Sequence, residues 1–162
     1  MSIFTLLKAD HRKIERLFER LRSMDLSLYT ARHNLFQKFK EELTLHSHAE
    51  EKFFYPVLKN MVRSHTLALE AYEQHHAVQM LLHELTQSHD PEEVWEAKLE
   101  VLAEQVLHHI HEEEHGLFPL AEKALNNDQL QNIAEQIQTW RKQVEKSHSL
   151  GIFHRFIHAL SA

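Results

Sequence analysis

The chain has 162 residues, enough for one domain around a single hydrophobic core, and a formal charge of −6 with neutral histidines. It contains no cysteine, which excludes disulfides, thiolate metal sites, iron–sulfur ligation and thiol catalysis. No basic patch indicates a nucleic-acid partner, and no segment approaches the roughly 20 apolar residues of a membrane span. The N-terminal apolar run is too short for a secretion signal, so we expect a cytoplasmic protein.

Only two glycines and three prolines occur, which favours an all-α fold. The apolar periodicity predicts five helices in chain order, at about residues 2–23, 28–60, 64–87, 91–125 and 128–149. Ser2 is the expected N-cap of the first helix, and Asp90 followed by Pro91 marks the start of the fourth. The fifth helix carries Ile133, Ile137 and other apolar residues on one stripe.

The connections between these helices are short, so consecutive helices are expected to be antiparallel neighbours. The predicted fold is therefore an antiparallel up-down-up-down four-helix bundle with an additional C-terminal helix. We expect residues 1–125 to form the bundle domain. Residues 126–162 form a helical extension, which we expect to pack on the bundle or to mediate a homodimer.

An internal repeat relates the two halves of the predicted bundle. The first and third helices carry matching seams 64 residues apart, with Leu7, His11, Ile14 and Phe18 corresponding to Ala71, His75, Val78 and Leu82. The second and fourth helices match at an offset of 63 residues, where His46-x-x-x-Glu50 corresponds to His109-x-x-x-Glu113. Duplicated helix pairs of this kind predict a bundle with pseudo-two-fold symmetry.

The seams that face the bundle interior are apolar except at six positions. These are His11, His46, Glu50, His75, His109 and Glu113. A carboxylate in a core is costly unless it is paired or bound to a metal, and two neighbouring carboxylates also repel each other. A dinuclear cation site removes both costs. A mixed set of imidazoles and carboxylates suits iron, manganese, zinc or copper better than calcium or magnesium.

Other polar residues near the seam have plainer interpretations. His48 and His111 point about 200° away from the seam histidines, so we expect them at the surface or behind the ligands. Glu15 and Gln79 correspond across the repeat and are candidates to orient the ligands. Pro56 and Pro119 are expected to kink the second and fourth helices beyond the ligands.

The combined motifs resemble the hemerythrin-like, or HHE cation-binding, family over about residues 3–125. The motifs are Asp10-His11, His46-x-x-x-Glu50-Glu51 before Phe54-Tyr55-Pro56, His75, and His109-x-x-x-Glu113-Glu114 before Leu117-Phe118-Pro119. The resemblance implies a four-helix bundle around two iron ions with an oxo or hydroxo bridge, with manganese and zinc as alternatives. It also implies that the six polar seam residues are the metal ligands.

The sequence departs from the oxygen-carrying hemerythrins at two places. Those proteins have a fifth histidine four residues from the one on the third helix, where this chain has Ala71 and Gln79. Their fourth helix carries His-x-x-x-x-Asp instead of His109-x-x-x-Glu113. The set of four histidines and two glutamates is more similar to bacterial members linked to nitric oxide stress and iron-centre repair.

Three functions remain open from the sequence. The first is a di-iron protein that binds or senses dioxygen, nitric oxide or peroxide. The second is a di-iron enzyme with peroxidase, catalase-like, nitric oxide-detoxifying or iron-centre-repair activity, in which Glu51, Glu114 or Tyr55 relays protons. The third is a bundle that holds another metal and acts through protein contacts.

Overall fold

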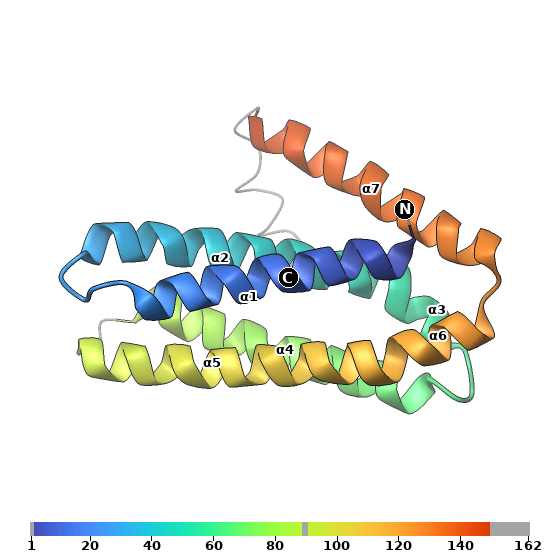
Figure 1. The fold of residues 1–162 in the computed structure, drawn as a ribbon, viewed down its shortest axis with the longest axis horizontal. Helices are drawn as coiled ribbons and strands as arrows, with labels where there is room; N and C mark the ends of the chain where they lie inside the picture. Colours follow the sequence, from blue (N-terminus) through green and yellow to red (C-terminus); the bar gives the residue numbers. More distant parts are fainter. Residues whose placement is uncertain (1, 89–90, 150–162) are drawn as a thin grey trace.

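The computed structural model describes residues 2–88 and 91–149, and within these ranges the chain is helical, without a β-strand. Four long helices form the bundle: α1 (Ile3–Ser23), α2 (Tyr29–Ala49), α4 (His65–Gln87) and α5 (Glu92–Glu112). α1 and α2 form one layer, and α4 and α5 form the second layer beneath it (Figure 1). Each helix runs opposite to the one before it, so the antiparallel up-down-up-down bundle is confirmed.

α2 and α5 both continue through a single π-helical turn into a short α-helix. The segments are η1 (Glu50–Phe54) followed by α3 (Tyr55–Lys59), and η2 (Glu113–Leu117) followed by α6 (Phe118–Ala124). Pro56 and Pro119 lie within the first two residues of α3 and α6. Where the sequence predicts kinks, the structure therefore has a π-helical turn that ends two residues before each proline, a feature frequent at functional sites.

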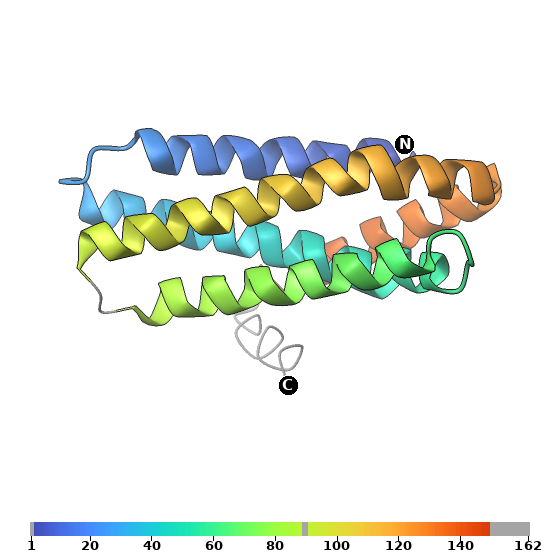
Figure 2. The same ribbon diagram turned by 90° about the horizontal axis from the view of Figure 1, so that it is seen from below.

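The additional C-terminal helix is α7 (Asn127–Ser149). It crosses the outer side of the α1–α2 layer, and the view from below shows α4 and α5 in front with α7 behind the bundle (Figures 1 and 2). Ile133, Ile137 and Trp140 are buried as expected, and the Trp140 ring contacts Phe53 with ring centroids 6.0 Å apart. The expected Asp90 cap and the C-terminal tail from residue 150 lie outside the described residues.

The core consists of two apolar clusters, one towards each end of the bundle. On α1, Ile3 and Leu7 belong to the cluster that also contains the buried face of α7. Ile14 and Phe18 belong to the second cluster, which fills the other end. His11 lies between these two pairs, and the other polar seam residues lie between the same two clusters. The packing therefore encloses a polar layer between two apolar ones.

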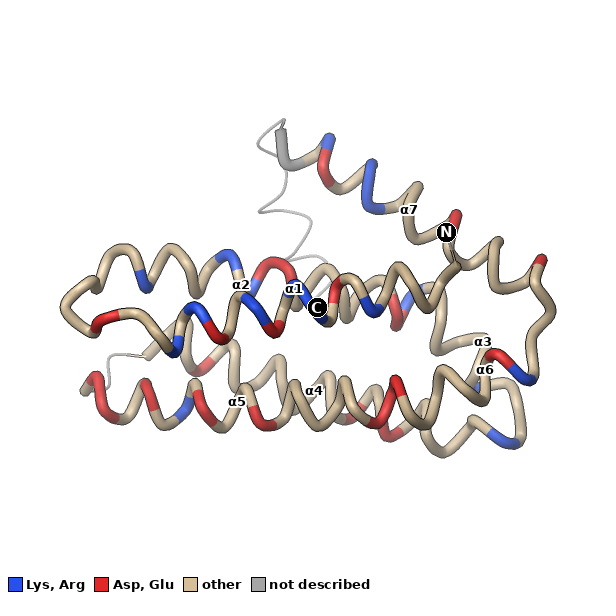
Figure 3. Tube along the Cα trace, in the orientation of Figure 1, with Lys and Arg blue, Asp and Glu red and all other residues tan. Residues whose placement is uncertain are grey.

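Ion pairs connect the two layers. Acidic residues are frequent along α5, whereas α1 and α2 carry many basic residues (Figure 3). Arg32, only 4% exposed, donates hydrogen bonds to Glu92 and Glu96 of α5, and Arg22 pairs with Glu100 at 3.3 Å. Among the described residues, no helix combines the length and apolar character needed to cross a membrane.

Candidate metal centre

The bundle brings all six predicted ligands into one buried layer. Their sources are His11 on α1, His46 on α2, His75 on α4, His109 on α5, and Glu50 and Glu113 at the starts of η1 and η2. None of the six is more than 4% exposed. They form two groups whose donor atoms lie within 4.8 Å of one another: His11, His46, Glu50 and Glu113, and Glu50, His75 and His109.

The histidines form two pairs whose Nε2 atoms face each other. The Nε2 atoms of His11 and His46 are 3.1 Å apart, and those of His75 and His109 are 2.9 Å apart. α1 and α2 supply the first pair, and α4 and α5 supply the second. The pseudo-two-fold relationship of the sequence repeat is therefore present in the arrangement of the site.

Each carboxylate lies between the two pairs. Glu50 Oε2 is 3.2 Å from His46 Nε2 and 3.5 Å from His75 Nε2. Glu113 Oε2 is 3.3 Å from His11 Nε2 and 3.6 Å from His109 Nε2. Each glutamate thus reaches one histidine of either pair, which is the placement needed for a carboxylate that bridges two cations.

A second set of polar side chains orients the four imidazoles through Nδ1. The contacts are His11 to Glu114 at 2.8 Å, His46 to Asp10 at 3.4 Å, His75 to Glu51 at 2.8 Å, and His109 to Gln74 at 2.7 Å. An Nδ1–H that donates to these oxygens leaves the Nε2 lone pair directed into the site. The four acceptors also follow the repeat, because Asp10 corresponds to Gln74 and Glu51 to Glu114.

The prediction that Glu15 and Gln79 orient the ligands is wrong. Glu15 pairs with Arg12 at 3.0 Å and lines an apolar pocket, and Gln79 is exposed. They lie one turn beyond the ligands on the same helices, whereas each actual acceptor comes from a neighbouring helix or turn. A sequence signal for the true acceptors does exist. Each one directly precedes or follows a predicted ligand, and its position recurs in both halves of the repeat.

The π-helical turn brings Tyr55 into the site beside Glu50. An α-helix would place residues five apart about 140° from each other around its axis. The wider η1 turn instead lets the fully buried Tyr55 hydroxyl donate to Glu113 Oε1 at 2.8 Å, with Glu50 Oε2 at 3.2 Å. The same oxygen is 3.2 Å from His75 Nε2 and 3.4 Å from His109 Nε2.

The corresponding residue in the second half is Phe118, which follows η2. Its ring stacks on the His11 imidazole, with centroids 5.8 Å apart and planes within 9°. The two halves therefore differ, since His75 and His109 face a phenol hydroxyl whereas His11 faces an apolar ring. This difference breaks the pseudo-symmetry inside the site.

Burial and charge shift the titration of the site residues in different directions. Burial lowers the pKa of His46 to about 4 and that of His109 to about 3, so both are neutral and able to act as ligands near pH 7. Burial alone would lower the pKa of His11, but Glu113 and Glu114 raise it overall. Burial and the nearby Glu113 raise the pKa of Glu50 well above its ordinary value.

The protein leaves part of this polar layer without partners. Glu50 Oε1 and Glu113 Oε2 are buried and accept no hydrogen bond from the described residues. A buried carboxylate oxygen without a donor is costly, and a cation supplies the missing partner. Four inward-facing imidazole nitrogens and two carboxylates fit a transition-metal ion, so the site has the chemistry of a metal-binding centre.

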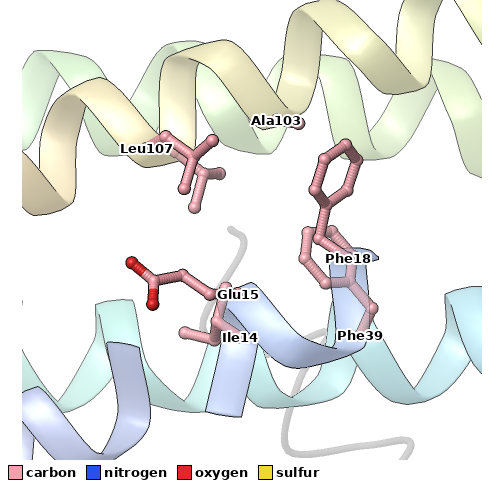
Figure 4. Close-up of a pocket in the computed structure, with 7 residues that line it drawn as sticks. Ile14, Glu15, Phe18, Phe39, Ala103 and Leu107 are labelled. Carbon is pink, nitrogen blue, oxygen red and sulfur yellow. The ribbon is translucent and has the colours of Figure 1, made fainter. Parts of the chain in front are cut away.

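An apolar pocket adjoins the site between α1 and α5 (Figure 4). It is lined by Ile14, Glu15, Phe18, Phe39, Ala103, Val106 and Leu107 and encloses a cavity of about 10 Å³. This volume holds about one water-sized molecule. Ile14 lies three residues after His11 and Val106 three before His109, so the pocket is one helical turn from the site. Glu15 and Leu107 face each other across the pocket, on the left of the view in Figure 4.

The remaining histidines on these helices lie away from the site. His76, His108 and His111 are exposed, and His48 is half-buried. The expectation that His48 and His111 point away from the seam is therefore confirmed.

The buried charge at Glu50 makes a testable prediction for the metal-free protein. Its pKa is raised from 4.5 in the folded chain, so the cost of ionising Glu50 is absent below that pH and grows as pH rises. Glu50→Gln should therefore stabilise the chelator-treated protein at pH 7 by about 1–4 kcal/mol, the range for relieving buried charge. Urea unfolding between pH 4 and pH 8 measures this gain, which should shrink towards acidic pH.

The exposed Glu19 provides the matched control, because Glu19→Gln removes the same charge outside the core. It should change stability by less than about 0.5 kcal/mol at any of these pH values. A metal-free Glu50→Gln variant no more stable than wild type at pH 7 would show that the protein itself satisfies this carboxylate.

Comparisons with known proteins agree with this geometry. The family model of the hemerythrin HHE cation-binding domain matches residues 2–121. The crystal structure of an HHE cation-binding domain-containing protein from Mycobacterium kansasii superposes with a TM-score of 0.75 and 22% identity, covering 91% of each chain. At that identity the structural match establishes the shared fold.

A curated relative, a DNA nickase of Nostoc sp., is 22% identical over 146 residues, or 90% of this chain. The match covers 41% of that protein, so this chain spans about two fifths of its relative's length. The family model, by contrast, covers most of this chain and includes all six predicted ligands. The chain therefore belongs to the hemerythrin HHE cation-binding domain family.

Proposed function

We propose that this chain is a non-haem di-iron protein whose centre binds or senses dioxygen, nitric oxide or peroxide. The observation that carries the proposal is the placement of Glu50 and Glu113, each within 3.6 Å of one histidine from either pair. Two cations held by the two histidine pairs would share both carboxylates. The unpaired oxygens of the same two residues would then have partners.

The donor set supports iron. Each histidine pair with the two shared carboxylates forms a mixed nitrogen and oxygen donor set, which suits iron and leaves coordination positions open. Iron held by these residues would supply redox chemistry and open coordination positions for a small ligand. Manganese and zinc share these ligands and remain the alternatives.

The chain's own residues would prepare the site for such a ligand. Glu114, Asp10, Glu51 and Gln74 hold the imidazoles with Nε2 inward, so little reorganisation is needed when metal binds. The apolar clusters on both sides exclude bulk water from the layer. The pocket between α1 and α5 lies one helical turn from this layer, and its apolar lining suits a small uncharged molecule.

A second candidate function is peroxide turnover, and Tyr55 is the observation that favours it. Its hydroxyl is fully buried and donates to Glu113 at 2.8 Å, so it is placed to deliver a proton inside the site. The corresponding reaction converts two molecules of hydrogen peroxide into two of water and one of dioxygen. Binding and turnover differ in the number of molecules consumed per centre.

One experiment separates these functions. Iron-loaded protein is reduced without oxygen and then titrated with dioxygen, nitric oxide or peroxide while its visible absorption is recorded. The proposal predicts a spectral change that saturates near one ligand per centre. Sustained loss of peroxide, abolished in Tyr55→Phe with its iron retained, would establish turnover instead. Iron-loaded protein whose spectrum responds to none of the three would contradict both functions.

The pocket adds a kinetic prediction. Ala103→Leu should fill the small cavity, because Ala103 is buried on its wall. Stopped-flow mixing with nitric oxide should then show association several-fold slower than in wild type, with the same final spectrum. Ala97→Leu, at an exposed position of the same helix, is the control and should bind at the wild-type rate. Equal rates in both variants would place the path for the ligand elsewhere.

A further inference from the structure

Four residues accept a hydrogen bond from the Nδ1 atom of a site histidine, and three of them also contact a charged side chain. Only one of these charged side chains lies outside the four-helix bundle. Arg12 of α1 donates to Glu114, and Gln74 donates its own amide N–H to Glu112. Arg141 of α7 donates from Nη1 to Asp10 Oδ1 at 3.1 Å and from Nη2 to Asp10 Oδ2. The family model ends at residue 121, so Arg141 belongs to the part of the chain beyond it.

Arg141 and Asp10 make a two-pronged contact. The planar guanidinium offers two parallel N–H donors, and such a pair fixes the orientation of a carboxylate more strictly than a single contact. Both side chains are only about one fifth exposed, at 22% and 20%, which limits competition from water.

Asp10, held by Arg141, also contacts His46, one of the predicted metal ligands. Its Oδ2 atom, which accepts from Arg141, also lies 3.4 Å from His46 Nδ1. A carboxylate acceptor at Nδ1 fixes the tautomer of His46 and makes Nε2 a stronger donor to a metal. α7 is held against the bundle independently of this contact, since Ile133, Ile137 and Val144 are buried in the cluster around α1.

The second half of the bundle has no equivalent of this connection among the described residues. The residue that corresponds to Asp10 is Gln74, a neutral amide that accepts from His109 at 2.7 Å. Its anchor, Glu112, lies on α5 inside the bundle. The Arg141–Asp10 contact of α7 therefore orients a histidine of the His11–His46 pair and none of the His75–His109 pair.

From this geometry we infer that Arg141 is a positioning residue of the metal centre, through which α7 strengthens metal binding at the His11–His46 position alone. The inference rests on the proposed metal function and goes beyond it by making the two positions unequal. It also gives α7 a part in the site although α7 supplies none of the six predicted ligands.

Metal affinity of the full chain tests this inference. Apoprotein is titrated with Co²⁺ in competition with a chromophoric chelator, and the cobalt absorption bands report the ligand field of each bound ion. Wild type should bind two equivalents. Asp10→Asn should weaken one equivalent by roughly 10- to 100-fold, as loss of an outer acceptor usually does. Arg141→Ala should weaken the same equivalent by roughly tenfold and shift its bands.

Three further variants separate positioning from general destabilisation. Lys142→Ala removes a neighbouring positive charge from the exposed face of α7 and should leave both equivalents unchanged. Arg141→Lys keeps the charge without the planar fork and should fall between wild type and Arg141→Ala. Asp10→Asn with Arg141→Ala should bind no more weakly than Asp10→Asn alone, because Arg141 acts through Asp10.

The outcomes distinguish this inference from the proposed function. If wild type binds two Co²⁺ ions and Arg141→Ala behaves like Lys142→Ala, the connection through α7 is refuted and the metal function stands. Equal weakening of both equivalents, or an additive double variant, likewise refutes it. A wild-type chain that binds no Co²⁺ would overturn both the proposed function and the inference.

Discussion

The structure depends on placing two carboxylates in the centre of a four-helix core. Glu50 and Glu113 are at most 1% exposed, and each retains a buried oxygen without a hydrogen-bond donor. The apolar clusters on either side give these two oxygens no hydrogen-bond donor. The folded protein therefore holds an uncompensated polar layer in the middle of the bundle. Bound cations would compensate this layer directly, and metal binding would then be coupled to the stability of the bundle.

The sequence was sufficient for most of the fold and for the members of the central layer. A 3-4 spacing with few breakers predicts four long helices, and polar residues such as His46 and Glu50 stand out on an otherwise apolar seam. The repeat then links each to a partner in the other half. These patterns are local, and the fold places each of those residues in the buried layer, with the fifth helix where it was expected.

The outer acceptors could not be predicted in the same way, because each belongs to a different element from the imidazole it holds. Asp10 of α1 contacts His46 of α2, and which neighbouring side chain reaches Nδ1 depends on helix rotation and interhelical distance. Seam spacing pointed instead to Glu15, one turn away on the same helix. Tyr55 similarly depends on the π-helical turn, whose extra residue per turn no periodicity in the sequence reveals.

The internal duplication is preserved in the predicted ligands and in the positions of the Nδ1 acceptors, but several residues around them differ in chemistry. Tyr55 corresponds to Phe118, and Asp10, anchored by Arg141, corresponds to the neutral Gln74. Imidazole basicity, proton supply and the covering helix consequently differ between the two halves. The two matching sets of predicted ligands therefore lie in unequal surroundings.

The most direct test of this account is anomalous diffraction from crystals of protein produced with ample iron, recorded on both sides of the iron absorption edge. The account predicts two iron peaks in the buried layer, one beside His11 and His46 and one beside His75 and His109. Both peaks should contact Glu50 and Glu113. The absence of iron peaks in this layer, or peaks at exposed histidines such as His111 and His115 alone, would contradict it.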